Sequence, residues 1–214
     1  LEHERSVRVA NFRIACLTAF VFMPVGWSLD WLVYPDQIKP FLVLRLVCSV
    51  LLLLIWWFVT TPFGARHYRF LGLILPGLPS LCISWMIFIK DGAQSVYYAG
   101  LNLVLLGAAM ILRWSVRESL LVVLEVMIIY LTACFLHAHK SGTPVDHSIF
   151  FNNTYFLFVT GAFVVIGSHF YNQLRFREFA LRFELDSNKK ILEVSNEKLD
   201  SQNKELADTI QKLT

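Results

Sequence analysis

The chain has 214 residues, of which 56% are hydrophobic and 16% are charged, whereas ordinary soluble domains carry about 25% charged residues. A soluble domain of this length needs polar side chains to cover its surface, so this composition excludes an ordinary water-soluble enzyme and favours a membrane protein. The formal net charge of +3 is too small to indicate that the chain binds nucleic acid.

The charges are distributed unevenly along the chain. Residues 173–214 hold eight basic and eight acidic side chains, which is close to half of all the charged residues. The remainder of the sequence is strongly apolar. We therefore predict an all-α membrane protein in two parts, with a transmembrane domain over residues 1–171 and a cytoplasmic coiled-coil helix over residues 172–214.

Six segments are apolar over about the 20 residues that a helix needs to cross the hydrocarbon core of a membrane. Short connections separate them, so we expect a bundle of six transmembrane helices in contact with membrane lipid. The predicted spans are residues 10–34, 41–63, 70–89, 95–112, 115–137 and 150–171.

The basic residues near the ends of these spans predict their orientation. An even number of spans places both termini on the same side, and basic residues near span ends favour the cytoplasm. Nine arginines fall on the side of the termini and three lysines on the opposite side, so we expect both termini to be cytoplasmic. The arginines are Arg5, Arg8, Arg13, Arg66, Arg69, Arg113, Arg117, Arg175 and Arg177, and the lysines are Lys39, Lys90 and Lys140.

Two ionisable side chains lie at a similar depth in the first two spans. Asp30 is near the outer end of the first span, and Arg45 is about one turn inside the outer end of the second. A charge at membrane depth is costly unless it is paired. We expect an ion pair between Asp30 and Arg45, with contact between Arg45 and a bound ligand as the alternative.

The third and fourth spans carry several candidate ligand contacts. Pro76 and Pro79 each remove a backbone donor from the third span, so we expect a kink that helps to form one wall of a pocket, together with Trp85. In the fourth span, Tyr98 and Asn102 add polar groups to this expected pocket.

The fifth span has an acidic residue, Glu125, near its middle. Glu118, Glu125, Thr132 and His139 follow one another at intervals of seven, so they form a polar stripe that we expect to face the bundle. This pattern is compatible with a protonated Glu125 that bonds another helix. It is equally compatible with a Glu125 that contacts a ligand or acts as a proton-linked switch.

The four cysteines, Cys16, Cys48, Cys82 and Cys134, all lie inside predicted spans and lack C-x-x-C spacing. We interpret them as small apolar packing residues, without a disulfide framework or a zinc site.

The histidines allow a haem to be considered as a cofactor. His67 and His169 both lie near the cytoplasmic ends of spans and share a depth, so together they are candidate ligands of one haem b. His139, at the outer end of the fifth span, is a candidate ligand of a second haem or of a metal ion. The alternative is that these histidines bond lipid headgroups or the backbone.

Leucines recur at every seventh position of the polar tail, which is the heptad pattern of a coiled coil. With these leucines at position d, asparagines occupy two of the a positions, and a buried a-position asparagine favours a parallel pair of helices. The expected dimerisation residues are Leu185, Leu192, Asn196, Leu199, Asn203, Leu206, Ile210 and Leu213. Proline and glycine are absent from residues 168–214, so we expect the sixth span to continue into this homodimeric coil.

Six short-looped spans followed by the helix ILEVSNEKLDSQNKELADTIQKLT resemble the amino-terminal membrane sensor modules of bacterial sensory enzymes. Two groups are similar: the receptors of quorum-sensing type histidine kinases, and the six-helix anchors of class III adenylate cyclases. The segment YYAGLNLVLL also resembles the fourth span of such receptors. The resemblance implies a place in the bacterial inner membrane and a catalytic kinase or cyclase domain after the tail.

We therefore expect a receptor that binds a small apolar or amphipathic signal molecule within the bundle and passes a conformational signal through the coiled coil. Catalytic motifs such as a Walker loop, G-x-G-x-x-G or H-E-x-x-H are absent from the sequence. Two alternatives stay open: a redox-sensing anchor that uses haem or quinone, and a passive dimerising anchor. The candidate ligand-binding residues are Arg45, Trp85, Tyr98, Asn102 and Glu125.

Overall fold

The computed structural model describes residues 2–112, 114–142 and 145–213, with side chains placed except at residues 2–8, 65, 68, 69 and 204–213. Every regular element in these ranges is helical, which confirms the predicted all-α class. The elements are α1 (Glu2–Val25), α2 (Trp27–Val33), η1 (Pro35–Gln37), α3 (Ile38–Thr60), α4 (Pro62–Arg66), α5 (Tyr68–Ile89), η2 (Gly92–Gln94), α6 (Tyr98–Ile111), α7 (Val116–Ser141) and α8 (His147–Leu213).

Five helical segments among the described residues are long and apolar enough to cross a membrane, and they overlap five of the six predicted spans. This confirms a membrane protein with several transmembrane helices. The segments are Val9–Val33, Pro35–Thr60, Phe70–Ile89, Val116–Ser141 and, within α8, His147–Asn203. Four arginines of the predicted cytoplasmic set, Arg5, Arg8, Arg69 and Arg113, lie outside the described side chains.

The fourth predicted span, residues 95–112, forms a shorter helix than expected. α6 has 14 residues, or about 21 Å at 1.5 Å per residue, against a hydrocarbon core of about 30 Å. The helix begins only at Tyr98 because Gly92, with a positive φ of 52°, starts the short turn η2 and a loop follows it. A bundle of six crossings therefore stays a prediction.

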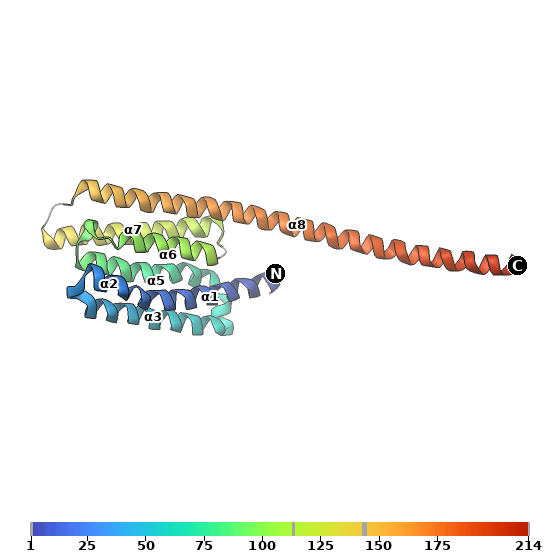
Figure 1. Cartoon of the computed structure of the whole chain (residues 1–214), viewed down its shortest axis with the longest axis horizontal. Coiled ribbons are helices and arrows are strands. Elements are labelled where there is room, and N and C mark those ends of the chain that lie inside the picture. Colours follow the sequence, from blue (N-terminus) through green and yellow to red (C-terminus); the bar gives the residue numbers. More distant parts are fainter. Residues whose placement is uncertain (1, 113, 143–144, 214) are drawn as a thin grey trace. The chain divides into compact units, whose positions relative to one another are not determined.

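α5 is the central helix of the membrane unit. It packs against α1, α3, α6 and α7, and Figure 1 shows these helices lying side by side. Of its most apolar stretch, 61% is buried by the protein itself, whereas the other long spans are between 22% and 39% buried. α5 continues through Pro76 and Pro79 as one helix, and the Ser80 hydroxyl donates to the carbonyl of Pro76 at 2.8 Å.

The polar stripe of the fifth span differs from our expectation. Glu118 and Glu125 are partly buried, but Thr132 and His139 are exposed, so only the first half of the stripe faces the bundle. A seven-residue interval drifts by about 20° at each step on a straight helix, which carries the later members outward. Glu118 also forms a capping box with Ser115 at the start of α7.

α8 contains both the last predicted span and the polar tail in one helix of 67 residues, as the absence of proline and glycine from residues 168–214 predicts. By its internal packing the chain divides into two units, Leu1–His169 and Phe170–Thr214. In the second unit the heptad residues Leu185, Leu192 and Leu199 are more than half exposed. The side chains of Leu206, Ile210 and Leu213 lie outside the described ones.

Candidate functional site

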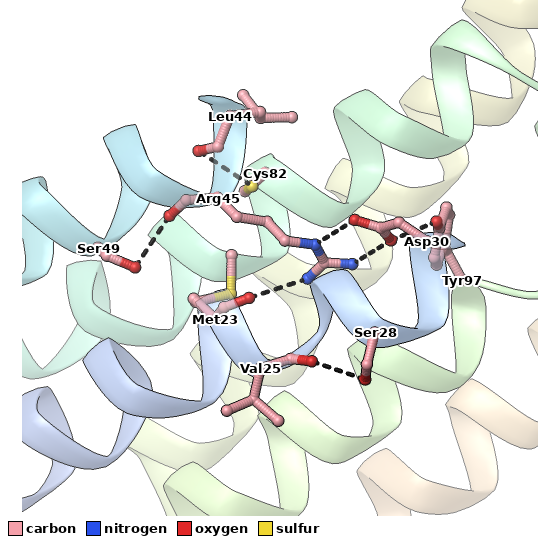
Figure 2. Close-up of polar contacts among 9 residues, drawn as sticks. All are labelled: Met23, Val25, Ser28, Asp30, Leu44, Arg45, Ser49, Cys82 and Tyr97. Atoms are coloured by element: carbon pink, nitrogen blue, oxygen red, sulfur yellow. Dashed lines mark hydrogen bonds and ion pairs between the residues drawn. The ribbon is translucent and has the colours of Figure 1, made fainter. Parts of the chain in front are cut away.

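A buried ion pair joins α2 to α3 near one end of the bundle. Arg45 Nε lies 2.7 Å from Asp30 Oδ2, and Arg45 Nη2 lies 2.8 Å from Asp30 Oδ1, so the guanidinium binds both carboxylate oxygens (Figure 2). The side chain of Asp30 is fully buried and that of Arg45 is 6% exposed. The predicted ion pair is therefore confirmed, and its two charges compensate each other inside the apolar bundle.

A break between α1 and α2 makes room for this pair. α1 ends at Val25, directly after Pro24, and α2 begins at Trp27. A side chain at the intervening Gly26 would overlap the Arg45 guanidinium, so glycine is what lets the guanidinium approach the backbone. Next to the break, the carbonyl of Met23 accepts a further hydrogen bond from Arg45 Nη1 at 3.3 Å.

Tyr97 supplies a further hydrogen bond to the buried carboxylate of Asp30. Its hydroxyl donates to Asp30 Oδ1 at 2.5 Å, and its ring packs against Tyr34 and Phe41 with centroid distances of 5.2 and 5.9 Å. Tyr97 precedes α6, so the segment between α5 and α6, residues 90–97, reaches back to α2. We call this segment the α5–α6 loop, and we call Asp30, Arg45 and Tyr97 the buried triad.

The α5–α6 loop also contacts the segment that joins α2 to α3. The hydroxyl of Tyr34 donates to Asp91 Oδ2 at 2.5 Å, and Lys90 forms an ion pair with Asp36. The Lys90 ammonium lies 5.5 Å from the centre of the Tyr34 ring. These contacts fix the first residues of the loop against Tyr34 and η1, which join α2 to α3.

On its other side the loop is held by α7 and α8. His137 Nδ1 is hydrogen bonded to the carbonyl of Phe88 at 2.8 Å, and the His137 ring packs closely on Gly92. Asn153, which is 3% exposed, donates from Nδ2 to the carbonyl of Ala93 at 2.9 Å. The α5–α6 loop therefore connects α2, η1, α7 and the first part of α8.

Sequence reasoning missed Tyr97 and the central position of this loop. One signal was present: a carboxylate accepts more hydrogen bonds than one guanidinium supplies, so a buried Asp30 needs a further donor. The sequence offers no means of choosing that donor, because Tyr97 lies 67 positions from Asp30.

Glu125, the acidic residue in the middle of α7, lies against α5. One of its carboxyl oxygens occupies the space that a side chain at Gly77 would need, and Gly77 stands between Pro76 and Pro79. Glu125 is partly buried. The structure therefore places this carboxyl next to the stretch of α5 where two backbone donors are missing.

The other predicted ligand contacts lie in different surroundings. Asn102 is partly buried, and in the described part of the chain its Oδ1 has no hydrogen-bond partner; the same holds for the hydroxyl of Ser84 on α5. Tyr98 is partly buried against the hydrophobic core. Trp85 is 54% exposed and stacks on Phe88 at 5.4 Å, so it lies on the outer surface of the single chain.

The predicted haem or metal ligands are all exposed. His67 bonds the carbonyl of Phe63 through Nδ1 at 3.1 Å and stacks on the Phe63 ring, while His139 and His169 lie near the ends of α7 and of the membrane unit. Within residues 2–112, 114–142 and 145–213, no group of three or more metal-binding side chains comes together. A haem between His67 and His169 stays a prediction, which the Soret absorbance of protein expressed with added haem would test.

Replacing Tyr97 with phenylalanine is expected to lower the free energy of unfolding by about 1–3 kcal/mol, because the buried Asp30 carboxylate loses a donor. Tyr98→Phe is the matched control: it removes a hydroxyl from the neighbouring residue, and we expect a change below about 0.5 kcal/mol. Unfolding of the purified protein in mixed micelles measures both. Equal losses in the two variants would contradict the role given to Tyr97.

One comparison with known proteins gives a match. The sequence model of the family MASE8 matches residues 28–186. The matched region includes the buried triad, the whole α5–α6 loop and the beginning of the tail. No curated protein and no solved structure matches the chain significantly.

Proposed function

Because the chain belongs to the MASE8 family, whose members are membrane-associated sensory domains, we propose that it is the receptor part of a bacterial signalling protein. In this proposal a small apolar or amphipathic molecule binds within the helix bundle. Binding changes the packing of α8, and the polar tail carries the change to a catalytic domain. The resemblance to sensory enzymes favours an adenylate cyclase or a histidine kinase as that domain.

The observation that carries this proposal is the set of contacts made by the α5–α6 loop. On one side the loop supplies Tyr97, whose hydroxyl bonds Asp30 of the buried triad. On the other side the loop carbonyl of Ala93 accepts a hydrogen bond from Asn153 of α8. A ligand that changes the position of the loop therefore changes the surroundings of α8 directly. Contacts of this kind connect a binding event to one helix without requiring the whole bundle to rearrange.

The polar groups that supply ligand contacts in this proposal lie on α5, α6 and α7. Ser84 and Asn102 carry buried oxygen atoms without protein partners in the described residues, and such atoms gain a hydrogen bond when a polar ligand group reaches them. The Glu125 carboxyl lies beside Gly77 of α5. Arg45 is already paired with Asp30, so we assign it to supporting the site rather than to contacting the ligand.

Transmission requires that two tails pair. The heptad leucines of the tail are exposed in the single chain, and we propose that they are covered in a parallel homodimer with both termini in the cytoplasm. Polar a positions such as Asn196 and Asn203 lower the stability of such a coil. A coil of low stability is easily shifted between two arrangements, as a transmitting helix must be.

Ligand-induced stabilisation tests the receptor proposal. The purified chain in nanodiscs is heated with medium-chain fatty alcohols, medium-chain fatty acids or a short-chain quinone, and a ligand present at about 100 times its Kd adds about 2.7 kcal/mol of stability. We expect at least one class to stabilise the protein and Asn102→Ala to reduce the effect. Asn188→Ala, on the exposed tail, is the control. If no class stabilises the chain, or if both variants respond alike, the proposed binding site is wrong.

A further inference from the structure

Two of the four cysteines face each other across the contact between α3 and α5. The thiols of Cys48 and Cys82 interact with one another, and both also interact electrostatically with Arg45. Cys82 Sγ additionally lies 3.8 Å from the carbonyl of Leu44, one turn before Cys48 on α3 (Figure 2). Both side chains are buried, with exposed fractions of 4% and 6%. The two thiols therefore lie close together inside the bundle, beside the buried triad.

The other two cysteines provide an internal comparison. Cys16 on α1 and Cys134 on α7 are equally buried, with exposed fractions of 0% and 1%. Cys134 has the Tyr130 hydroxyl as its neighbour. Burial alone is thus common to all four thiols, and what distinguishes Cys48 and Cys82 is their mutual contact.

We propose that Cys48 and Cys82 form a reversible disulfide bond when a membrane-soluble quinone oxidises them. The two thiols together lose two protons and two electrons as the bond between the sulfur atoms forms, and the quinone takes up both pairs to become a quinol. Thiols that already lie close together need only a small approach to reach disulfide geometry. An apolar oxidant suits the site, because the thiols are shielded from water within the bundle.

This bond would join α3 covalently to the central helix α5. Arg45 lies three residues before Cys48 on α3, so the bond would restrain the side of α3 that holds the buried triad. The oxidation state of the pair would then set how freely α3 and α5 move against each other. This inference does not depend on the ligand proposed above, since it concerns only the thiols and their oxidant.

Counting free thiols tests the inference. The whole purified chain is treated with decylubiquinone or with the thiol oxidant diamide, denatured, alkylated with N-ethylmaleimide and weighed by mass spectrometry. We expect four alkylated cysteines before oxidation and two after it, a peptide that links residues 48 and 82, and recovery of all four thiols after reduction. The oxidised chain should migrate as a monomer on a non-reducing gel.

Matched variants show which thiols react. The double variant Cys16→Ser/Cys134→Ser retains the Cys48 and Cys82 pair, so both of its free thiols should disappear on oxidation. The single variant Cys48→Ser lacks the pair and should keep all three of its free thiols. Thermal unfolding verifies that each variant is folded. The proposal would be overturned by any of three results: four free thiols after both oxidants, a disulfide bond that includes Cys16 or Cys134, or a covalent quinone adduct. Oxidation by diamide alone would overturn the assignment of a quinone as the oxidant.

Discussion

Replacing Asp30 with alanine is expected to lower the free energy of unfolding by about 3–5 kcal/mol, the largest effect we predict for one substitution. The variant leaves the Arg45 guanidinium, which is 6% exposed, without the carboxylate that binds two of its nitrogens. A buried charge without its partner costs far more than the pair itself contributes. Unfolding of the purified chain in mixed micelles measures the loss.

The double variant Asp30→Leu/Arg45→Met is the control for this prediction. It removes both charges and keeps apolar volume, so we expect much of the stability lost by the single variant to return, with a coupling energy well above 1 kcal/mol between the two positions. A small loss in Asp30→Ala, below about 1 kcal/mol, would show that Arg45 finds water or a lipid headgroup instead. In that case the buried triad would not be a fixed part of the structure.

Replacing Leu192 and Leu199 with lysine is expected to abolish pairing of the tails. Each buried d-position leucine contributes about 2–5 kcal/mol to a packed core, and the double variant removes two from each chain while adding like charges. The measurement is disulfide cross-linking between chains in membranes, with Asn196→Cys as the reporter in a background where the native cysteines are serine. We expect efficient cross-linking with the leucines present and a loss of at least about tenfold without them.

A cysteine at Ser201 is the control for geometry. In the predicted register Ser201 falls at position f, on the outside of the coil, so Ser201→Cys should cross-link far less than Asn196→Cys. Equal cross-linking at both positions would indicate random collision or a different register. No cross-linking at Asn196 in intact membranes would contradict the parallel dimer.

Much of the fold could be predicted from composition and charge. The long apolar segments identify five helices of membrane length, since in lipid a single segment satisfies all its backbone groups by itself only as a helix. The pairing of Asp30 with Arg45 follows from their shared depth, because each charge at that depth requires a partner. The continuity of α8 follows from the lack of proline and glycine after His147 apart from Gly161 and Gly167, which a helix in a membrane tolerates.

The rest depends on contacts between distant parts of the chain. Residues 95–97 are predicted to start a span, yet they belong to the α5–α6 loop, because Tyr97, Ala93 and Gly92 in this loop bond or pack against three other elements. The exposure of Trp85 could not be predicted for the same reason. Its place on α5 is clear from the sequence, but packing decides which side of α5 faces α7. The Cys48 and Cys82 contact likewise needs the mutual placement of α3 and α5.

The most direct test of the receptor account is whether the bundle controls the tail. Asn153→Ala removes the bond between α8 and the α5–α6 loop, and Leu103→Ala, at a side chain that is 71% exposed on α6, is the control. The measurement is the rate of cross-linking at Asn196→Cys. A coupling of about 1–3 kcal/mol predicts a change of at least about fivefold in Asn153→Ala and none in Leu103→Ala. Equal rates in all three proteins would contradict the account and favour a passive dimerising anchor.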